Sequence, residues 1–434
     1  MSNIKEWTGA DILTLAEGLS EKPYTLFFDS SRVSHPSSQW SFLCWDPVET
    51  ISAKNGVIQH NGTIIDEKDV FKLLKLRLRE YKFEKSDIPF TGGLAGYWGY
   101  DLGRQLEHLP EDTVDDINAP DMIVGIYTNV ITHDHEKNQT WLIGEEPEVE
   151  KIQDGPIPLL RWQSQISESK YKDKVQQAID YIYAGEIYQV NLSRRFEADL
   201  TSDFKPFAHY KYLRDVNPAP FGAYMNFGDL QLSSSSPERF LRCDGLVIET
   251  QPIKGTLPSS QSADNLKQSQ KDIAENTMIV DLLRNDLSKV CDYHSVKVPK
   301  LCELQTFEGL HHLVSTVTGE LKENKTSLDL LKACFPGGSI TGAPKIRAME
   351  IIEELEETRR GPYCGAMGYI GFDGQMDTNI MIRTLIYKNE KAYLQTGSGI
   401  VSDSKLEAEL QESLDKAAKI FESFGGVDVK ENAA

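Results

Sequence analysis

The sequence predicts a mixed α/β protein whose sheets are mainly antiparallel. Two observations carry this prediction, namely short apolar runs bounded by turn residues and longer segments with apolar residues at helical spacing. Residues 24–29 form a strand-like run, and residues 57–65 are typical of a hairpin around Asn61-Gly62. An Asn-Gly pair between two such runs is a strong short-range hairpin signal. Sheets and helices of this kind pack as layers around a shared core.

The chain divides into two regions at an acidic, proline-containing stretch. Region one covers residues 1–150, with a helix expected at residues 70–78 and a glycine-rich segment at residues 92–100, where backbones must pass closely. Residues 145–158 are expected to be a linker. In region two, residues 168–425, a strand is expected at residues 187–198. Helices are expected at residues 171–182, 267–283, 328–334, 341–357 and 406–421.

Composition narrows the class of protein. The chain has 434 residues, 40% of them hydrophobic, and a formal net charge of −20, which disfavours a nucleic-acid partner. It holds no apolar run long enough to span a membrane, and its N-terminus lacks the pattern of a signal peptide. The six cysteines have no CxxC spacing, which suits reduced thiols in the cytoplasm.

The most informative motif is Pro252-Ile253-Lys254-Gly255-Thr256, at the end of a strand-like run. A lysine there is usually solvated. Three further segments accompany it: Ser-Ser-Pro-Glu-Arg-Phe at 235–240, Phe-Pro-Gly-Gly-Ser-Ile-Thr-Gly-Ala-Pro-Lys at 335–345 and Gly-Ser-Gly-Ile-Val at 397–401. In this order and spacing, residues 20–425 resemble the chorismate-utilising enzymes. Lysine at position 254 is typical of the aminodeoxychorismate synthases of that family, where anthranilate synthases carry alanine.

The resemblance implies a fold and a reaction. The fold would be two stacked, mainly antiparallel sheets forming a sandwich flanked by helices, with both regions contributing. Region one would match the N-terminal part of anthranilate synthase component I, and region two the catalytic part. The reaction would convert chorismate and ammonia to 4-amino-4-deoxychorismate, on the way to 4-aminobenzoate and folate. A glutamine amidotransferase subunit would supply the ammonia, and an aminodeoxychorismate lyase would act next.

Two residues would carry the bond-making steps that the resemblance implies. Lys254 would attack ring carbon 2 of chorismate while Glu238 protonates the hydroxyl that leaves carbon 4. A hydroxyl is a poor leaving group and needs this proton, and an amine attacks only when it is neutral. Ammonia would then add at carbon 4 and expel the lysine. His312 matches the active-site histidine of the family.

The resemblance also implies a magnesium ion, held by Glu275 and Glu412. Magnesium is held by few carboxylates and keeps waters that substrate oxygens can replace. It would bridge an acidic protein and a dianionic substrate. Glu409 lies three residues before Glu412, on the same face of the expected helix. Its role is left open between a contact at the metal site and a solvated acidic face.

The implied substrate contacts combine charged side chains with small residues. Arg383 would bind a substrate carboxylate, for which the planar guanidinium is suited. Lys345 stands at the start of a helix, where backbone N–H groups favour anions. The full set is Gly255, Thr256, Thr341, Lys345, Tyr369, Arg383, Gly397, Ser398 and Gly399.

Strand pairing leaves one question open at this site. Asp244-Gly245 is typical of a two-residue hairpin turn, which would pair Cys243 with Leu246 and Glu238 with Gln251. Ideal alternation would then place Lys254 on the face opposite Glu238. A bulge or a strand end near Pro252 would return both side chains to one pocket.

Region one resembles the part of anthranilate synthases that binds feedback tryptophan. The implied pocket would be lined by Ser30, Ser37, Ser38, Gln39, Trp40, Pro220 and Phe221. The family has a Leu-Leu-Glu-Ser element here, and this chain has Phe27-Phe28-Asp29-Ser30. This departure leaves amino-acid binding open.

The sequence disfavours three alternatives to an aminodeoxychorismate synthase. Lys254 disfavours an anthranilate synthase. A non-catalytic chorismate-binding paralogue would have no chemical reason to keep an acid, a nucleophile and metal ligands together. The water-using isochorismate synthases place a lysine where this chain has Gln189, and an amide cannot act as that base. No cysteine lies in a Gly-x-Cys-x-Gly turn, so we expect dependence on a separate glutaminase.

Overall fold

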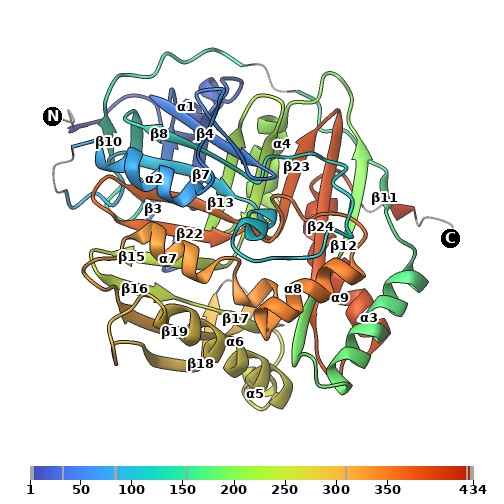
Figure 1. Ribbon diagram of the computed structural model, residues 1–434. Helices are drawn as coiled ribbons and strands as arrows, with labels where there is room; N and C mark the ends of the chain where they lie inside the picture. The colour runs from blue at the N-terminus through green and yellow to red at the C-terminus, as the bar shows by residue number, and fades with distance from the viewer. Residues whose placement is uncertain are drawn as a thin grey trace.

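The computed structural model describes residues 4–31, 34–82, 86–152, 155–307, 310–426 and 429–430. Two large sheets pack face to face and helices cover their outer surfaces (Figure 1). Side chains from both sheets, among them Leu26, Phe42, Tyr97 and Met367, share one hydrophobic core. The predicted sandwich of mainly antiparallel sheets is confirmed.

The first sheet has 13 strands within the described residues. Their spatial order is β1 (Ile4–Glu6), β10 (Gln139–Ile143), β9 (Val130–Asp134), β3 (Trp40–Cys44), β2 (Thr25–Asp29), β13 (Phe221–Asn226), β14 (Gln231–Ser236), β23 (Thr384–Lys388), β24 (Lys391–Ile400), β12 (Gln189–Asp199), β11 (Trp162–Ser164) and β25 (Val429–Lys430), with β20 (Gly342–Ala343) beside β12. All these pairings are antiparallel except that of β11 with β25.

The second sheet has 12 strands in the same part of the chain. Their order is β17 (Ile253–Pro258), β19 (Leu310–Glu320), β16 (Val247–Thr250), β15 (Arg239–Asp244), β22 (Met376–Ile380), β21 (Ala366–Gly371), β7 (Gly93–Trp98), β8 (Met122–Tyr127), β4 (Glu49–Lys54), β5 (Val57–His60) and β6 (Thr63–Ile65), with β18 (Lys297–Phe307) beside β19. Every pairing in this sheet is antiparallel.

The expected helices are present in the described chain, with small differences at their ends, and two further helices, at residues 12–19 and 206–216, were not predicted. The helices are α1 (Ile12–Leu19), α2 (Val70–Arg79), α3 (Glu168–Tyr183), α4 (Pro206–Val216), α5 (Ala263–Lys267), α6 (Gln270–Ser288), α7 (Ser327–Cys334), α8 (Lys345–Leu355) and α9 (Leu406–Glu422), with the 3-10 turns η1 (Tyr100–Gln105) and η2 (Gly338–Ile340). The helix expected at residues 267–283 is divided into α5 and α6, because Ser269 caps a new helix. None of the described helices is long and apolar enough to cross a membrane.

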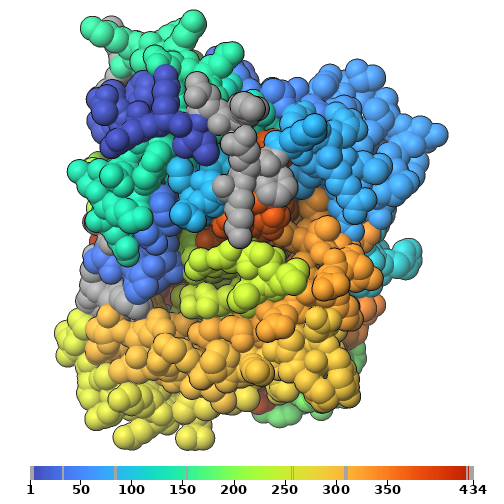
Figure 2. Space-filling model, turned by 90° about the vertical axis from the view of Figure 1, so that its left-hand side faces the viewer, coloured from blue at the N-terminus to red at the C-terminus, as the bar shows by residue number. Residues whose placement is uncertain are grey.

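The two sequence regions do not form separate sheets. Strand β2 of region one pairs with β13 of region two, and β7 pairs with β21. Gly93 makes the second pairing possible, because a Cβ there would lie 2.2 Å from the Ile370 carbonyl oxygen of β21. Gly96 does the same for the pairing of β7 with β8, since its Cβ would lie 2.2 Å from the Ile123 carbonyl oxygen. Figure 2 shows one face of the result, with N-terminal segments in blue and blue-green above and later segments in yellow-green to orange below.

The hairpin between β15 and β16 differs from its prediction. Asp244 pairs with Val247, so the turn is Gly245-Leu246 and not Asp244-Gly245. Gly245 has a φ of 62°, and glycine at the first turn position is what a type II′ turn requires. The predicted pairing of Cys243 with Leu246 is therefore wrong, and Cys243 pairs with Ile248. The Asn61-Gly62 hairpin is confirmed, with His60 opposite Thr63.

Candidate active site

A bulge in β17 directly follows Lys254. The chain leaves β16 after Thr250 and begins β17 at Ile253, where it pairs with β19. Lys254 lies opposite Leu313, and the register shifts before Thr256. Gly255 has a φ of 72°, and a Cβ there would lie 2.7 Å from the Leu266 side chain. Glycine is therefore required at the bulge, and simple alternation from β15 does not apply.

Glu238 lies in the short connection between β14 and β15. Its side chain is buried, and its backbone carbonyl accepts a hydrogen bond from the Ile380 N–H at 3.0 Å. Burial raises the pKa of Glu238, and the charges of Lys254 and Lys416 together with the Ser339 hydroxyl offset only part of that rise. The charge of Lys254 thus acts on Glu238, and the acid keeps its proton to a higher pH than an exposed glutamate.

Two glutamates from different helices face the same lysine. Burial raises the pKa of Glu275 on α6, while Lys254 and Lys271 lower it in part. Burial also pushes the pKa of Glu412 on α9 upward, but Lys416, Lys271 and Lys254 together hold it below its usual value. The predicted residues Glu238, Lys254, Glu275 and Glu412 are thus brought together from four separate parts of the chain.

Two lysines of this cluster were missed by sequence reasoning. Lys416 donates to Glu412 at 2.7 Å and to the Gly397 carbonyl at 2.8 Å. Lys271 lies 3.9 Å from Glu275. Each lysine is four residues from its glutamate on the same helix, and i,i+4 spacing brings such side chains together. This i,i+4 spacing could have identified both lysines from the sequence.

The carboxylates provide oxygen donors suited to a hard cation. Glu409 is 1% exposed, and its Oε1 accepts a hydrogen bond from Ser404 at 2.6 Å. Its Oε2 is buried and has no hydrogen-bond partner. Lys271 lies 3.5 Å from Glu409. Within the described ranges, no three acidic, histidine or cysteine side chains are close enough to hold a metal by themselves. A few carboxylates completed by water or substrate oxygens are what magnesium uses.

His312 and the glycine segment of β24 lie on strands next to the cluster of Lys254, Glu275 and Glu412. His312 lies opposite Thr256 in β19, next to the partner of Lys254. Gly397, Ser398 and Gly399 pair with residues 191–193 of β12. A Cβ at Gly399 would lie 2.3 Å from the amide nitrogen of Gln189, and the Gln189 side-chain oxygen is buried without a partner. The glycines thus allow a buried amide to approach this strand closely.

Arg383 and Thr341 have distinctive backbones. Arg383 has a φ of 51°, in the left-handed region, just before β23. Such backbone strain in a non-glycine residue tends to occur at functional sites. The Thr341 hydroxyl donates to the Gly337 carbonyl at 2.9 Å. Their contacts with substrate stay predictions.

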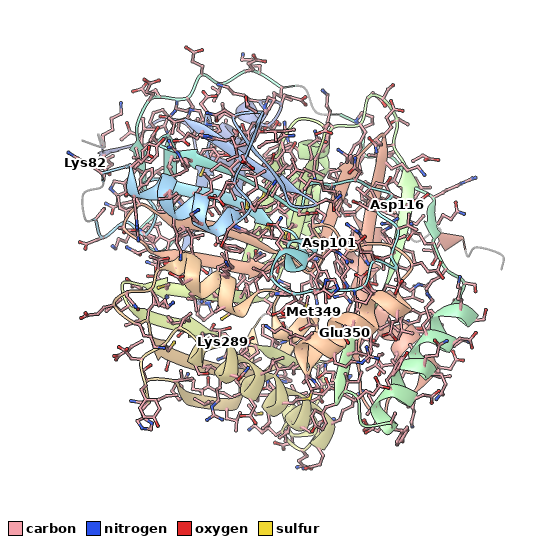
Figure 3. All side chains as sticks on the ribbon, in the orientation of Figure 1. Lys82, Asp101, Asp116, Lys289, Met349 and Glu350 are labelled. Carbon is pink, nitrogen blue, oxygen red and sulfur yellow. The ribbon has the colours of Figure 1, made fainter. Side chains whose placement is uncertain are left out.

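The contacts of Lys345 give it a different role from the predicted one. Its ammonium donates to Asp286 at 2.6 Å and to the Cys334 carbonyl at 2.8 Å. Lys289, labelled at the end of α6 in Figure 3, binds the same carboxylate at 2.8 Å. Lys345 therefore joins α8 to α6, and these contacts do not support its predicted binding of substrate.

Tyr369 lies in a second cavity, and its predicted place at the active site is corrected here. Its ring centroid is 4.5 Å from that of Phe90 and 5.0 Å from that of Phe42. Side chains alternate along β21, so Tyr369 and Met367 face the core between the sheets, whereas Ala366 and Ile370 face the other side. Tyr369 therefore forms part of the wall of this second cavity.

The second cavity has a volume of about 130 Å³ and coincides with the predicted amino-acid pocket. Its lining includes the predicted residues Ser30, Ser37, Gln39, Trp40, Pro220 and Phe221. Ser38 is buried and lies outside this lining. Asp29, where the sequence departs from the family, accepts hydrogen bonds from Arg214 at 2.7 Å and Tyr210 at 3.0 Å. Occupation by an amino acid stays a prediction.

Comparisons with known proteins identify the family of this chain. The profile of the chorismate binding enzyme family matches residues 25–422. The chain is 41% identical to aminodeoxychorismate synthase component 1 of Escherichia coli, over 94% of each chain. It is 38% identical to anthranilate synthase component 1 of Thermus thermophilus, over 93% of each.

Solved structures agree on the fold. Anthranilate synthase component I from Streptococcus pneumoniae superposes with a TM-score of 0.81 at 35% identity, covering 88% of this chain and 92% of that one. The isochorismate synthase MenF from Escherichia coli, at 16% identity, shares the fold with a TM-score of 0.75, over 98% of this chain and 94% of its own. The chain therefore belongs to the chorismate-binding enzyme family.

Proposed function

We propose that the protein catalyses the reaction of an aminodeoxychorismate synthase component 1, in which chorismate is aminated at ring carbon 4. The observation that carries this proposal is that Glu238 is a buried acid with a raised pKa on which the charge of Lys254 acts. An amine beside a carboxylic acid that keeps its proton is the pair needed to exchange an allylic hydroxyl for nitrogen. The similarity to the Escherichia coli enzyme supports the same assignment.

In the first step the Lys254 amine attacks ring carbon 2. A carbon–nitrogen bond forms, the two ring double bonds shift, and the bond from carbon 4 to its hydroxyl breaks. The Glu238 carboxyl gives its proton to that oxygen, which leaves as water. The lysine nitrogen loses one proton, which the Glu238 carboxylate can take up. The product is an adduct of chorismate minus water on Lys254.

In the second step ammonia attacks carbon 4. The double bonds shift back, and the bond between carbon 2 and the lysine nitrogen breaks. The Glu238 carboxyl gives its proton to the lysine nitrogen, which leaves as the neutral amine, and the Glu238 carboxylate then takes up the proton that the added ammonia loses. The product, 4-amino-4-deoxychorismate, keeps the enolpyruvyl group. With glutamine as the source of ammonia, the net change is an amino-group transfer of the aminotransferase type.

Magnesium is the proposed cofactor, with Glu275 and Glu412 as its ligands and Glu409 beside them. The ion would supply positive charge for the substrate carboxylates in a chain of net charge −20. The buried Glu409 oxygen without a partner supports an additional cation or bound water there. Arg383 is proposed to bind a second substrate carboxylate, and Ser339 holds the Glu238 side chain.

The proposed partners follow from the reaction. A glutaminase subunit would supply ammonia, and a lyase would remove pyruvate from the product to give 4-aminobenzoate for folate synthesis. We expect the complex in the cytoplasm, since all six cysteines are free thiols. The acidic surface gives nucleic acid no favourable site.

The test is product identification with chorismate, magnesium and an ammonium salt. We expect 4-amino-4-deoxychorismate from the unaltered protein, and without ammonia an adduct of chorismate minus water on Lys254 in the intact mass. Lys254→Ala should abolish both. Anthranilate as the main product would favour anthranilate synthase, and a complete lack of turnover would favour a binding paralogue. A fully active Lys254→Arg variant, with no adduct on the parent protein, would end the covalent mechanism.

A further inference from the structure

Lys271 lies among three carboxylates at a helix position that is unfavourable for a cation. It is the second residue of α6, and a positive charge in the first turn faces the positive end of the helix dipole. Its Nζ nevertheless lies 3.5 Å from Glu409 Oε1 and 3.9 Å from Glu275 Oε1. Burial lowers the pKa of Lys271, but Glu409, Glu275 and Glu412 raise it overall. The carboxylates therefore hold this ammonium in place.

These contacts leave the carboxylates only partly satisfied. Both distances exceed the roughly 2.7–2.9 Å of a charge-assisted hydrogen bond. Glu409 Oε2 is buried and has no hydrogen-bond partner. Glu275 and Glu409 could therefore accept a cation that lies closer to their oxygens than the Lys271 ammonium does.

The lysine can move, whereas the carboxylates beside it cannot. The Lys271 side chain is 39% exposed, compared with 12% for Glu275 and 2% for Glu409. An ammonium on a flexible four-carbon stem can turn to solvent without any change in the backbone. Glu409 is held by Ser404 and enclosed in the fold.

We propose that Lys271 is a displaceable counter-ion for the metal site. It neutralises Glu275 and Glu409 while no divalent cation is bound, and it turns to solvent when magnesium binds the carboxylates. The inference rests on the magnesium site proposed above. It makes Lys271 a competitor of the metal, so that the affinity for magnesium is lower than the carboxylates alone would give.

The test compares magnesium binding by calorimetry across matched variants. Lys271→Met removes the competitor, and we expect the dissociation constant to fall about three- to tenfold. Lys271→Arg keeps the charge but offers a planar fork that can engage both carboxylates, so it should bind magnesium more weakly than the unaltered protein. Lys267→Met is the control, because it removes the same charge on α5 and Lys267 forms no ion pair with these described carboxylates. Equal shifts in Lys271→Met and Lys267→Met would overturn the proposal.

A second measurement follows the lysine directly. Acetylation of Lys271, read by mass spectrometry, should become faster at saturating magnesium, while that of Lys267 stays the same. Magnesium binding with no change at Lys271 would end the counter-ion role and leave the proposed metal site standing. No magnesium binding in any of these proteins would remove both. Binding by Lys271→Met alone would support displacement most strongly.

Discussion

At the scale of single residues, the functional groups are defined by their surroundings more than by their type. Glu238 and Glu275 have raised pKa values and Glu412 a lowered one, because the balance of burial and lysine charge differs at each. The motifs identified these three glutamates. They could not show that Tyr369 faces another cavity, since that depends on which side of β21 faces the N-terminal strands.

Glu238→Gln should separate catalysis from stability. Glutamine keeps the shape but cannot donate a proton to the leaving hydroxyl, so kcat should fall by about 10²–10⁴-fold. The folded-state pKa of Glu238 is raised, so its contribution to stability is fully present below the unfolded pKa. That contribution is lost as pH rises through the folded pKa. Urea unfolding from pH 4 to pH 8 should show the stability of the parent falling relative to Glu238→Gln.

Two results would contradict the role of Glu238 as the acid. If the stability difference between the two proteins does not change with pH, the Glu238 carboxyl is ionised in the fold across that range. It could not then act as the acid. A Glu238→Gln variant that forms product at the parent rate would also remove Glu238 from the mechanism.

At the scale of elements, irregular strand pairing sets how Lys254 and Glu238 are placed. Strand β15 shifts register between Arg239 and Leu241, next to Glu238, and β17 shifts register just after Lys254. The sequence allowed two outcomes. Alternation along the hairpin predicted that Lys254 and Glu238 lie on opposite faces of the sheet, whereas Pro252 suggested that the pairing is interrupted before Lys254. Alternation could not settle the matter, since the register shift between Arg239 and Leu241 interrupts β15 next to Glu238. The turn between β15 and β16 was predicted one residue too early, at Asp244-Gly245, because Asp-Gly and Gly-Leu can both form two-residue turns.

Gly255→Ala should disturb this element specifically. A left-handed backbone costs a non-glycine residue about 1–2 kcal/mol, and at Gly255 the new Cβ would also lie 2.7 Å from Leu266 and 3.0 Å from Asp272. Gly245→Ala is the control, because Gly245 has a φ of 62° with nothing within 4 Å of the added Cβ. We expect Gly255→Ala to lose about 1–3 kcal/mol more than the control in urea unfolding, and to form less Lys254 adduct. Equal losses in both variants would mean that the bulge adapts to the extra methyl group.

At the scale of the whole molecule, the interleaving of the two regions is the feature that the sequence could least define. The motifs lie in order along region two, yet β2, β3, β7 and β8 of region one complete both sheets. Long-range pairings such as Tyr369 with Ala95 leave no local pattern beyond glycines that permit close approach. The sandwich itself was predictable only through the family resemblance, and the second cavity follows from it because it lies where strands of both regions meet.

The whole chain also lacks a thiol suited to glutamine hydrolysis, which gives the last prediction. Five of the six cysteines are buried, and burial raises the pKa of Cys291 to about 11 and that of Cys364 to about 12. A thiol nucleophile must be a thiolate. The purified chain should therefore turn over chorismate with ammonium salts and not with glutamine, and its rate should rise with pH as free ammonia increases, until Glu238 ionises. Product formation from amide-¹⁵N glutamine, with ¹⁵N ammonium as the positive control, measures both routes. Labelled product from glutamine in the absence of any second subunit would contradict the need for a glutaminase partner.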